Sequence, residues 1–219
     1  MSPIKVLIAD DHKIVRDSLK ALINKKGTCA QVIAEADDGR KAIELAQKLR
    51  PDVVIMDVLM PDMNGIDATR AIIRDNAGSR IIGLSMLNEK RYILAMLEAG
   101  ASGYVLKDCS FHELLSAIRN VAGGKLYLCP PASDMIVKGF RDTTNNCSHG
   151  PCAVLSPRER EILQLYAEGM GTKEIAAHLH ISPKTSQSHR RNIEKKLELH
   201  GYAELTKYAI REGLVSIER

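Results

Sequence analysis

Residues 53–65 read VVIMDVLMPDMNG, and this stretch decides which fold the chain can adopt. Four apolar residues lead straight into Asp57, and the turn-forming residues Pro-Asp-Met-Asn-Gly soon follow. A short run rich in Val and Ile that is closed by turn residues is typical of a strand buried on both faces, as in a parallel sheet. Asp57 would then stand at the carboxyl end of the strand, where open α/β sheets bind their ligands. The alternative is an ordinary turn residue, because Asp commonly follows a strand.

A second apolar run supplies two more acids. Residues 5–9 read KVLIA and end in Asp10-Asp11. Strands that alternate with helices enter a sheet in the same direction, so we expect these acids at the same edge as Asp57. Like charges crowded together are costly unless a cation neutralises them, and an all-oxygen cluster suits Mg²⁺. The sequence therefore predicts a Mg²⁺ site beside one reactive carboxylate.

The chain up to about residue 122 alternates five predicted strands with five predicted helices. We expect the strands near residues 5–9, 30–35, 53–57, 80–84 and 103–106, and the helices near residues 13–25, 39–49, 66–74, 90–99 and 110–122. This alternation predicts a five-stranded, doubly wound parallel sheet of the flavodoxin-like α/β class. No G-x-G-x-x-G fingerprint follows the first predicted strand, which argues against a dinucleotide-binding domain.

Two further predicted strands end in polar side chains, Ser85 and Lys107. By the same edge argument, a hydroxyl and an ammonium would join the three acids, although a helix cap and a solvated charge are the ordinary alternatives. Together with Asp10-Asp11, the motif MDVLMPDMNG around Asp57, and Tyr104, these residues resemble the receiver domain of bacterial two-component response regulators. The resemblance covers roughly residues 4 to 122.

The resemblance implies a phosphoryl-transfer site. Asp57 would accept a phosphoryl group from the phosphohistidine of a sensor histidine kinase. Asp11, Asp57 and the backbone carbonyl of Leu59 would bind Mg²⁺ directly, and Asp10 would act through water. Lys107 would help to compensate the charge on the phosphoryl oxygens, which is most of what this chemistry requires.

The resemblance also implies a switch. After phosphorylation Ser85 would swing its hydroxyl towards a phosphoryl oxygen, and Tyr104 would follow inward, which changes the surface over residues 86–106. The alternative for Tyr104 is a half-buried strand aromatic, because strands favour Tyr. Leu59 and Leu87 occupy positions that border the path of the hydrolytic water in this family. We therefore hypothesise that these apolar side chains make the phosphorylated state long-lived.

The last part of the chain opens with a helix-start signal. Ser156 is a predicted N-cap, Pro157 suits the first helical position, and Glu159 completes a capping box. Two short predicted helices, a tight turn at residues 180–182 and a longer basic helix then predict a helix-turn-helix. Residues 184–196 carry five bases against one acid, which fits either a solvated helix face or a footprint for a phosphate backbone.

The segments LSPREREIL, KEIA and SPKT, followed by HRRNIEKKL, resemble the LuxR-type DNA-binding domain. With Ile193 and Leu197 facing inward, the opposite face of the long helix could enter a major groove. There Gln187 could read adenine, and the basic side chains mostly contact phosphate. The candidate contacts to double-stranded DNA are Lys184, Thr185, Gln187, Ser188, His189, Arg190, Arg191 and Lys195. The chain departs from the LuxR-type pattern at two positions. Ser186 stands where the family usually has an apolar residue, which predicts weaker packing. Gln187 stands where the family often has a basic residue, which leaves the target sequence open.

The 219 residues suit two domains. Because the composition is ordinary and no apolar run has signal-peptide or membrane-spanning length, we expect a cytoplasmic protein without membrane contact. The five scattered cysteines suit a reducing compartment. Cys147, His149 and Cys152 resemble part of a metal site, but their spacing fits no common zinc module. We predict a receiver domain over residues 1–124, a linker over 125–153 that could hold a short helix from Pro130 to Phe140, and a DNA-binding domain over 154–219.

The whole pattern predicts a transcription regulator that forms a homodimer on paired half-sites when it is phosphorylated, since linked half-sites raise affinity without new contacts. Beyond its own phosphorylation and slow dephosphorylation, we expect no enzymatic activity. One rival is a phosphatase with a transient aspartyl-phosphate, but dehalogenase-like phosphatases need an acid where this chain has Leu59. The other rival is a regulator that binds DNA or a protein without phosphorylation.

Overall fold

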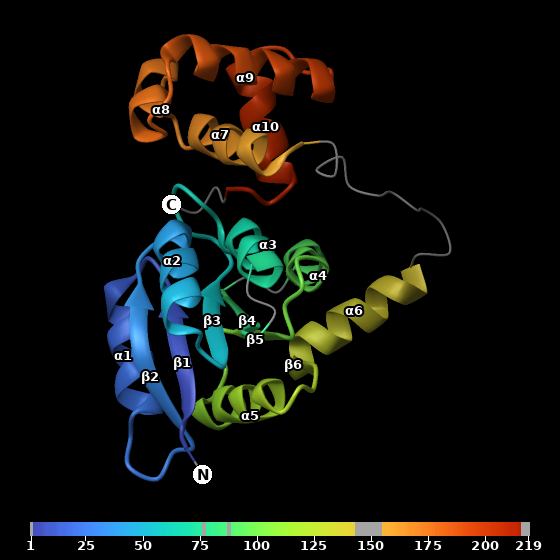
Figure 1. Cartoon of the computed structure of the whole chain (residues 1–219). Coiled ribbons are helices and arrows are strands. Elements are labelled where there is room, and N and C mark those ends of the chain that lie inside the picture. The colour runs from blue at the N-terminus through green and yellow to red at the C-terminus, as the bar shows by residue number, and fades with distance from the viewer. Residues whose placement is uncertain (1, 76–77, 87–88, 143–154, 216–219) are drawn as a thin grey trace. The chain divides into compact units, whose positions relative to one another are not determined.

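The computed structural model describes residues 2–75, 78–86, 89–142 and 155–215 (Figure 1). The chain divides into two compact units, Met1–Asn145 and Asn146–Arg219. Each unit has its own apolar core. Across the described ranges, no helix is both long enough and apolar enough to cross a membrane.

The first unit is built on a parallel sheet with the strand order β2-β1-β3-β4-β5-β6. The strands are β1 (Ile4–Ala9), β2 (Ala30–Ala36), β3 (Val53–Asp57), β4 (Arg80–Ser85), β5 (Gly103–Leu106) and β6 (Tyr127–Leu128). The predicted doubly wound α/β fold is confirmed, and the five predicted strands lie within one residue of their expected bounds. All five residues of β3 are buried, as a central parallel strand requires.

Helices cover both faces of this sheet (Figure 1). Alternate residues of β1 point to opposite sides, so that Leu7 and Ala9 join one apolar cluster while Val6 and Ile8 join the other. The first cluster is completed by α2 (Gly39–Leu49), α3 (Gly65–Asp75) and α4 (Lys90–Glu98), and the second by α1 (Lys13–Ile23) and α5 (Phe111–Ala122). Because every strand pair is parallel, the carboxyl ends of the strands lie at one edge of the sheet.

The prediction of five strands was wrong by one, because β6 extends the sheet beyond β5. The amide of Tyr127 donates to the carbonyl of Ser102 at 3.0 Å, and the amide of Cys129 donates to the carbonyl of Tyr104 at 3.0 Å. A strand of two residues is too short to show an alternating pattern, so sequence periodicity could not reveal it.

Ordered structure of the first unit therefore continues past residue 124. Helix α6 (Pro130–Asp142) follows β6 and places Ala132 in the apolar cluster that contains Met96 of α4. A helix from Pro130 was expected, and the observed one runs to Asp142. Residues 143–153 of the predicted linker lie outside the described residues, and so do Cys147, His149 and Cys152.

The second unit is helical. Its described helices are α7 (Pro157–Ala167), α8 (Thr172–His178), α9 (Pro183–Leu197) and α10 (Tyr202–Arg211). The predicted capping box is present at the start of α7, where Ser156 and Glu159 bond each other's backbone amides. The core gathers Ile162 and Leu165 of α7 with Ile175 of α8 and Ile193 of α9. Because α8 and α9 are joined by a short turn in which His180 has a positive φ of 52°, they form the predicted helix-turn-helix.

Candidate functional site

The three predicted acids lie together at the carboxyl edge of the sheet. β1 and β3 are neighbours in a register that pairs Ala9 with Met56, so Asp10 and Asp57 follow at the same level. Asp10 is fully buried and Asp57 is 4% exposed. Ligand atoms of Asp10, Asp11, His12 and Asp57 all lie within 4.8 Å of one another. The sequence reasoning placed the acids correctly but did not consider the histidine.

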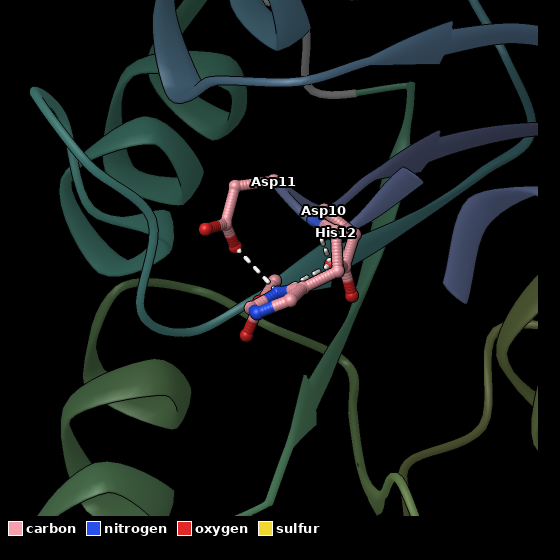
Figure 2. A group of neighbouring side chains, drawn as sticks. Asp10, Asp11 and His12 are labelled. Atoms are coloured by element: carbon pink, nitrogen blue, oxygen red, sulfur yellow. Dashed lines mark hydrogen bonds and ion pairs between the residues drawn. The ribbon is translucent and has the colours of Figure 1, made fainter. Parts of the chain in front are cut away.

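The turn after β1 arranges its own side chains (Figure 2). The backbone amide of His12 donates to Oδ1 of Asp10 at 2.8 Å. Figure 2 shows the His12 ring lying towards both acids, with Nδ1 at 3.0 Å from Oδ1 of Asp11 and 3.4 Å from Oδ1 of Asp10. The His12 side chain is 63% exposed, so this ring forms the outer side of the acidic cluster.

Lys107 links two of the acids from the end of β5. Its Nζ lies 2.7 Å from Oδ2 of Asp10 and 2.8 Å from Oδ2 of Asp57. Burial lowers the pKa of Lys107, but Asp57 and Asp10 raise it by more, so the net pKa lies above its ordinary value. Burial raises the pKa of Asp57 to about 6, while Lys107 lowers it and Asp10 raises it further. At neutral pH Asp57 is therefore mostly a carboxylate beside a charged ammonium.

The donor set fits a hard divalent cation. The ammonium of Lys107 pairs with Asp10 and Asp57, and Asp11 adds a third carboxylate, so negative charge is in excess where their oxygens meet. Carboxylate oxygens are the ligands that Mg²⁺ prefers, and Mg²⁺ commonly binds through only one or two of them while keeping several waters. The residues present thus match the predicted metal in chemistry and in proximity.

The turn after β3 is folded tightly against the end of its own strand. The amide of Leu59 donates to Oδ1 of Asp57 at 3.3 Å, and the amide of Gly65 donates to the carbonyl of Val58 at 3.0 Å. A Cβ at residue 65 would lie 1.8 Å from the backbone oxygen of Asp57, so only glycine fits there. The Asn64 side chain caps α3 by accepting from the amide of Asp67 at 2.9 Å. These local contacts hold Leu59 half-buried beside Asp57.

The two predicted switch residues are in contact. Ser85 ends β4 and is 2% exposed, and its side chain hydrogen-bonds the phenol of Tyr104 on the neighbouring strand β5. The Tyr104 ring is fully buried, so the alternative of a half-buried strand aromatic was wrong. Burial raises the pKa of this phenol above its ordinary value, which keeps it neutral. Leu87, the second predicted shielding residue, lies outside the described residues.

An apolar groove of about 320 Å³ lies between α1 and α5 and reaches Lys107. Its lining includes Leu19 of α1, Phe111 of α5 and Cys109. Ile14 on its rim is 81% exposed, which is unusual for a large apolar side chain. The sequence analysis did not anticipate this groove.

The long basic helix α9 has a buried side and an exposed side. Ile193 and Ser186 face the core of the second unit. His189 and Arg190 lie half-buried at its two flanks. Arg190 is also engaged within the unit, since its Nε lies 3.4 Å from Oε1 of Glu194 and its guanidinium lies over the Tyr202 ring. The exposed candidate contacts are Lys184, Thr185, Gln187, Ser188, Arg191 and Lys195.

The sequence analysis missed one contact of α9, made by Lys196, and singled out Ser186 without its hydrogen-bonding state. Lys196 anchors the end of α9 to the start of α7, because its Nζ donates to Oε2 of Glu159 at 2.7 Å. The same oxygen accepts from the amide and the hydroxyl of Ser156, each at 2.8 Å. The hydroxyl of Ser186, the departure noted in the sequence, is fully buried without a hydrogen-bond partner among the described residues.

Comparisons with known proteins match both units. The family model of the response regulator receiver domain matches residues 6–119, and that of the bacterial regulatory proteins of the luxR family matches residues 153–209. The oxygen regulatory protein NreC of Staphylococcus carnosus is 37% identical, over 96% of this chain and 99% of its own length. The transcriptional regulatory protein DegU of Brevibacillus brevis is 31% identical, over 98% of this chain and 96% of its own length.

Solved structures agree with these sequence matches. The RcsB response regulator of Salmonella typhimurium is 30% identical, with a TM-score of 0.59 over 95% of this chain and 98% of that one. The response regulator ChrA of a heme-sensing two-component system is 31% identical, with a TM-score of 0.54 over 98% of this chain and all of that one. The relatives are transcription regulators and not metabolic enzymes. The chain therefore belongs to the LuxR-type two-component response regulators, which join a receiver domain to a helix-turn-helix DNA-binding domain.

Proposed function

We propose that this regulator is switched by phosphorylation of Asp57 and that the switch controls its binding to double-stranded DNA. The phosphoryl group would come from the phosphohistidine of a sensor histidine kinase. The observation that carries the proposal is the placement of Asp57, which is buried at a strand end between the ammonium of Lys107 and the acids of the β1 turn. Because bacterial DNA lies in the cytoplasm, we place the protein's action there.

The local chemistry supports phosphoryl transfer to this side chain. With a pKa of about 6, Asp57 is mostly ionised at neutral pH and can act as the nucleophile. Its oxygen–phosphorus bond forms as the phosphorus–nitrogen bond of the phosphohistidine breaks. Lys107 lies 2.8 Å from the carboxylate and can compensate charge on the transferred group.

Four groups of this chain would hold Mg²⁺: the carboxylates of Asp11 and Asp57 directly, the backbone carbonyl of Leu59 directly, and Asp10 through water. The bound ion would neutralise charge on the phosphoryl oxygens. Such a positive charge matters most at Asp57, because burial raises the pKa of its carboxyl and Asp10 raises it further.

The contact between Ser85 and Tyr104 supports a switch that starts at the phosphoryl group. A new oxygen at Asp57 can draw the Ser85 hydroxyl away from the phenol, because a charged acceptor forms the stronger hydrogen bond. Tyr104 would then adjust its place in the apolar cluster beside α4. The change would be passed on from β5 to the residue after β6, because the amide of Cys129 donates to the carbonyl of Tyr104.

We further propose that a phosphorylated homodimer binds paired half-sites on DNA. A solved relative supports this mode, since one structure is described as two RcsB dimers bound to two parallel DNAs. On the exposed side of α9, Lys184, Arg191 and Lys195 would contact phosphates, and Gln187 would read a base edge. Thr185, Ser188 and His189 are further candidate contacts, whereas Arg190 would reach a phosphate only alongside its internal contacts.

The test uses a small phosphodonor with Mg²⁺ and genomic DNA fragments selected by the protein itself. Intact-protein mass spectrometry should find one added phosphoryl group on the wild type and none on Asp57→Asn. Asp62→Asn is the matched control, because Asp62 lies in the same turn but outside the acidic cluster. DNA affinity, measured by fluorescence anisotropy, should change on phosphodonor treatment in the wild type and in the control only. Equal DNA affinity of all treated proteins would instead establish the phosphorylation-independent regulator.

A further inference from the structure

Arg16 bonds the backbone of the turn that carries Asp10 and Asp11. From the first turn of α1, its Nη1 donates to the backbone carbonyl of Asp10 at 2.6 Å and to that of Asp11 at 3.2 Å. One nitrogen thus joins two consecutive carbonyls of the segment that carries two of the three acids. The Arg16 side chain is only 14% exposed, so these bonds are largely shielded from water.

A chain of charges holds Arg16 in place. Its Nε lies 3.9 Å from Oε2 of Glu35, which stands on β2 beside β1. The other oxygen of Glu35 accepts from Nζ of Lys20 at 2.5 Å, one turn further along α1. Such a relay fixes the guanidinium in one orientation, because a planar fork with partners on two sides loses its rotational freedom.

The direction of the Asp11 carboxylate depends on this turn. Asp10 is the last residue with a sheet contact, since its amide donates to the carbonyl of Ala36 at 3.2 Å. Asp11 lies beyond the strand, so its side-chain direction follows from the backbone of the turn. A bond from Arg16 to both carbonyls therefore sets where the carboxylates of Asp10 and Asp11 meet that of Asp57.

We propose that Arg16 is a positioning residue for the divalent cation site: it acts through the backbone of Asp10 and Asp11 and keeps their carboxylates aimed at Asp57. The inference rests on the Mg²⁺ site of the proposed function and adds a residue to it. Outer residues that orient metal ligands typically contribute about 10- to 100-fold to metal affinity.

Electrostatics alone predicts that removal of Arg16 strengthens Mg²⁺ binding. Arg16 is a cation close to a cation site, so its removal would relieve repulsion. Positioning predicts that removal weakens binding. The substitution Arg16→Lys separates the two effects, because it keeps the charge and loses the planar guanidinium that Glu35 holds in one orientation against the turn. Arg16→Met loses both.

The measurement is the rise of the thermal unfolding midpoint of the first unit with increasing Mg²⁺, using the full chain and fitting the dissociation constant by linkage. Each variant is compared with its own Mg²⁺-free midpoint, so a merely structural loss lowers the baseline and leaves the fitted constant unchanged. Lys13→Met is the matched control, because Lys13 is an exposed base on the same turn of α1.

We expect Arg16→Lys and Arg16→Met each to weaken Mg²⁺ binding by about tenfold or more, and Lys13→Met to leave it unchanged. Phosphorylation by a small phosphodonor should need correspondingly more Mg²⁺ in both Arg16 variants and approach the wild-type rate at saturation. Unchanged Mg²⁺ affinity in both variants, or tighter binding in Arg16→Met, overturns the inference while the proposed function stands. If Mg²⁺ does not change the stability of the wild-type chain, both the inference about Arg16 and the proposed function are overturned.

Discussion

Replacing Asp57 with Asn should stabilise the metal-free first unit at neutral pH, although it removes the residue proposed to accept phosphate. Burial raises the pKa of Asp57 from an ordinary value of 3.8 to about 6. The folded unit therefore favours the protonated form, and stability that is present at low pH is lost as the pH rises through the folded pKa. A difference of about two pKa units corresponds to about 3 kcal/mol at neutral pH.

Asn carries no charge at any pH and so avoids this cost. Part of the gain is offset because Lys107 loses a charged partner at 2.8 Å, although Asp10 at 2.7 Å remains. We expect a net gain of about 1–3 kcal/mol near pH 7 and little or no gain near pH 4, where the wild-type carboxyl is largely protonated.

Urea unfolding of the full chain in the presence of a chelator measures this difference at both pH values. Asp37→Asn is a control of opposite sign, because a hydrogen bond from Lys41 lowers the pKa of this exposed acid. That variant should lose no more than about 0.5 kcal/mol near pH 7. The reasoning is refuted if Asp57→Asn destabilises the unit near pH 7, or if its gain is the same at both pH values.

Four other predictions concern separate residues. Ser186→Ala should stabilise the second unit by about 1 kcal/mol in urea unfolding, because it removes a buried hydroxyl without a partner among the described residues; a loss of stability would contradict this. Lys196→Met should destabilise the same unit by about 1 kcal/mol, and more than Lys195→Met does, because only Lys196 donates to Glu159 among the described contacts of these two bases. Because exposed apolar surface favours contact with a protein partner, we expect the kinase to dock on the groove beside Lys107. Ile14→Glu at its rim should then slow phosphorylation by the kinase at least about tenfold, a difference of about 1.4 kcal/mol, and leave phosphorylation by a small phosphodonor unchanged. Equal slowing with both donors would show that the groove is not where the kinase docks. Leu59→Asn should shorten the lifetime of radiolabelled phosphoprotein, since a polar side chain beside Asp57 admits water; an unchanged lifetime would reject the shielding hypothesis.

The sheet was predictable because its signal is local and repeated. Strands β1, β3 and β4 are each built on a short apolar run, and the runs that lead to Asp10, Asp57 and Ser85 all enter the sheet in the same direction. The convergence of their polar ends then follows from topology alone. β6 was not predictable, since Tyr127 and Leu128 gain their strand pairing from β5 and not from a pattern of their own.

Sequence patterns could not predict the contacts that support the functional residues. Arg16 and Lys196 are ordinary helix bases in the sequence, and only the folded chain places one on the acidic turn and the other on the start of α7. Tyr104 was expected to be a switch residue, but its complete burial depends on helices distant in sequence. Spacing along the chain predicts which side chains share an edge, and it does not predict which backbone groups they bond.

The short strand β6 also decides where the first unit can be cut. A gene fragment that ends at residue 124 would remove β6 and leave the outer side of β5 with unpaired amides and carbonyls. Such an open edge readily pairs with the edge of another molecule, so the fragment would be prone to aggregate. It would also strip α6 from the apolar surface around Met96. A fragment meant for crystals or for NMR spectra of this half of the protein should therefore extend through residue 142.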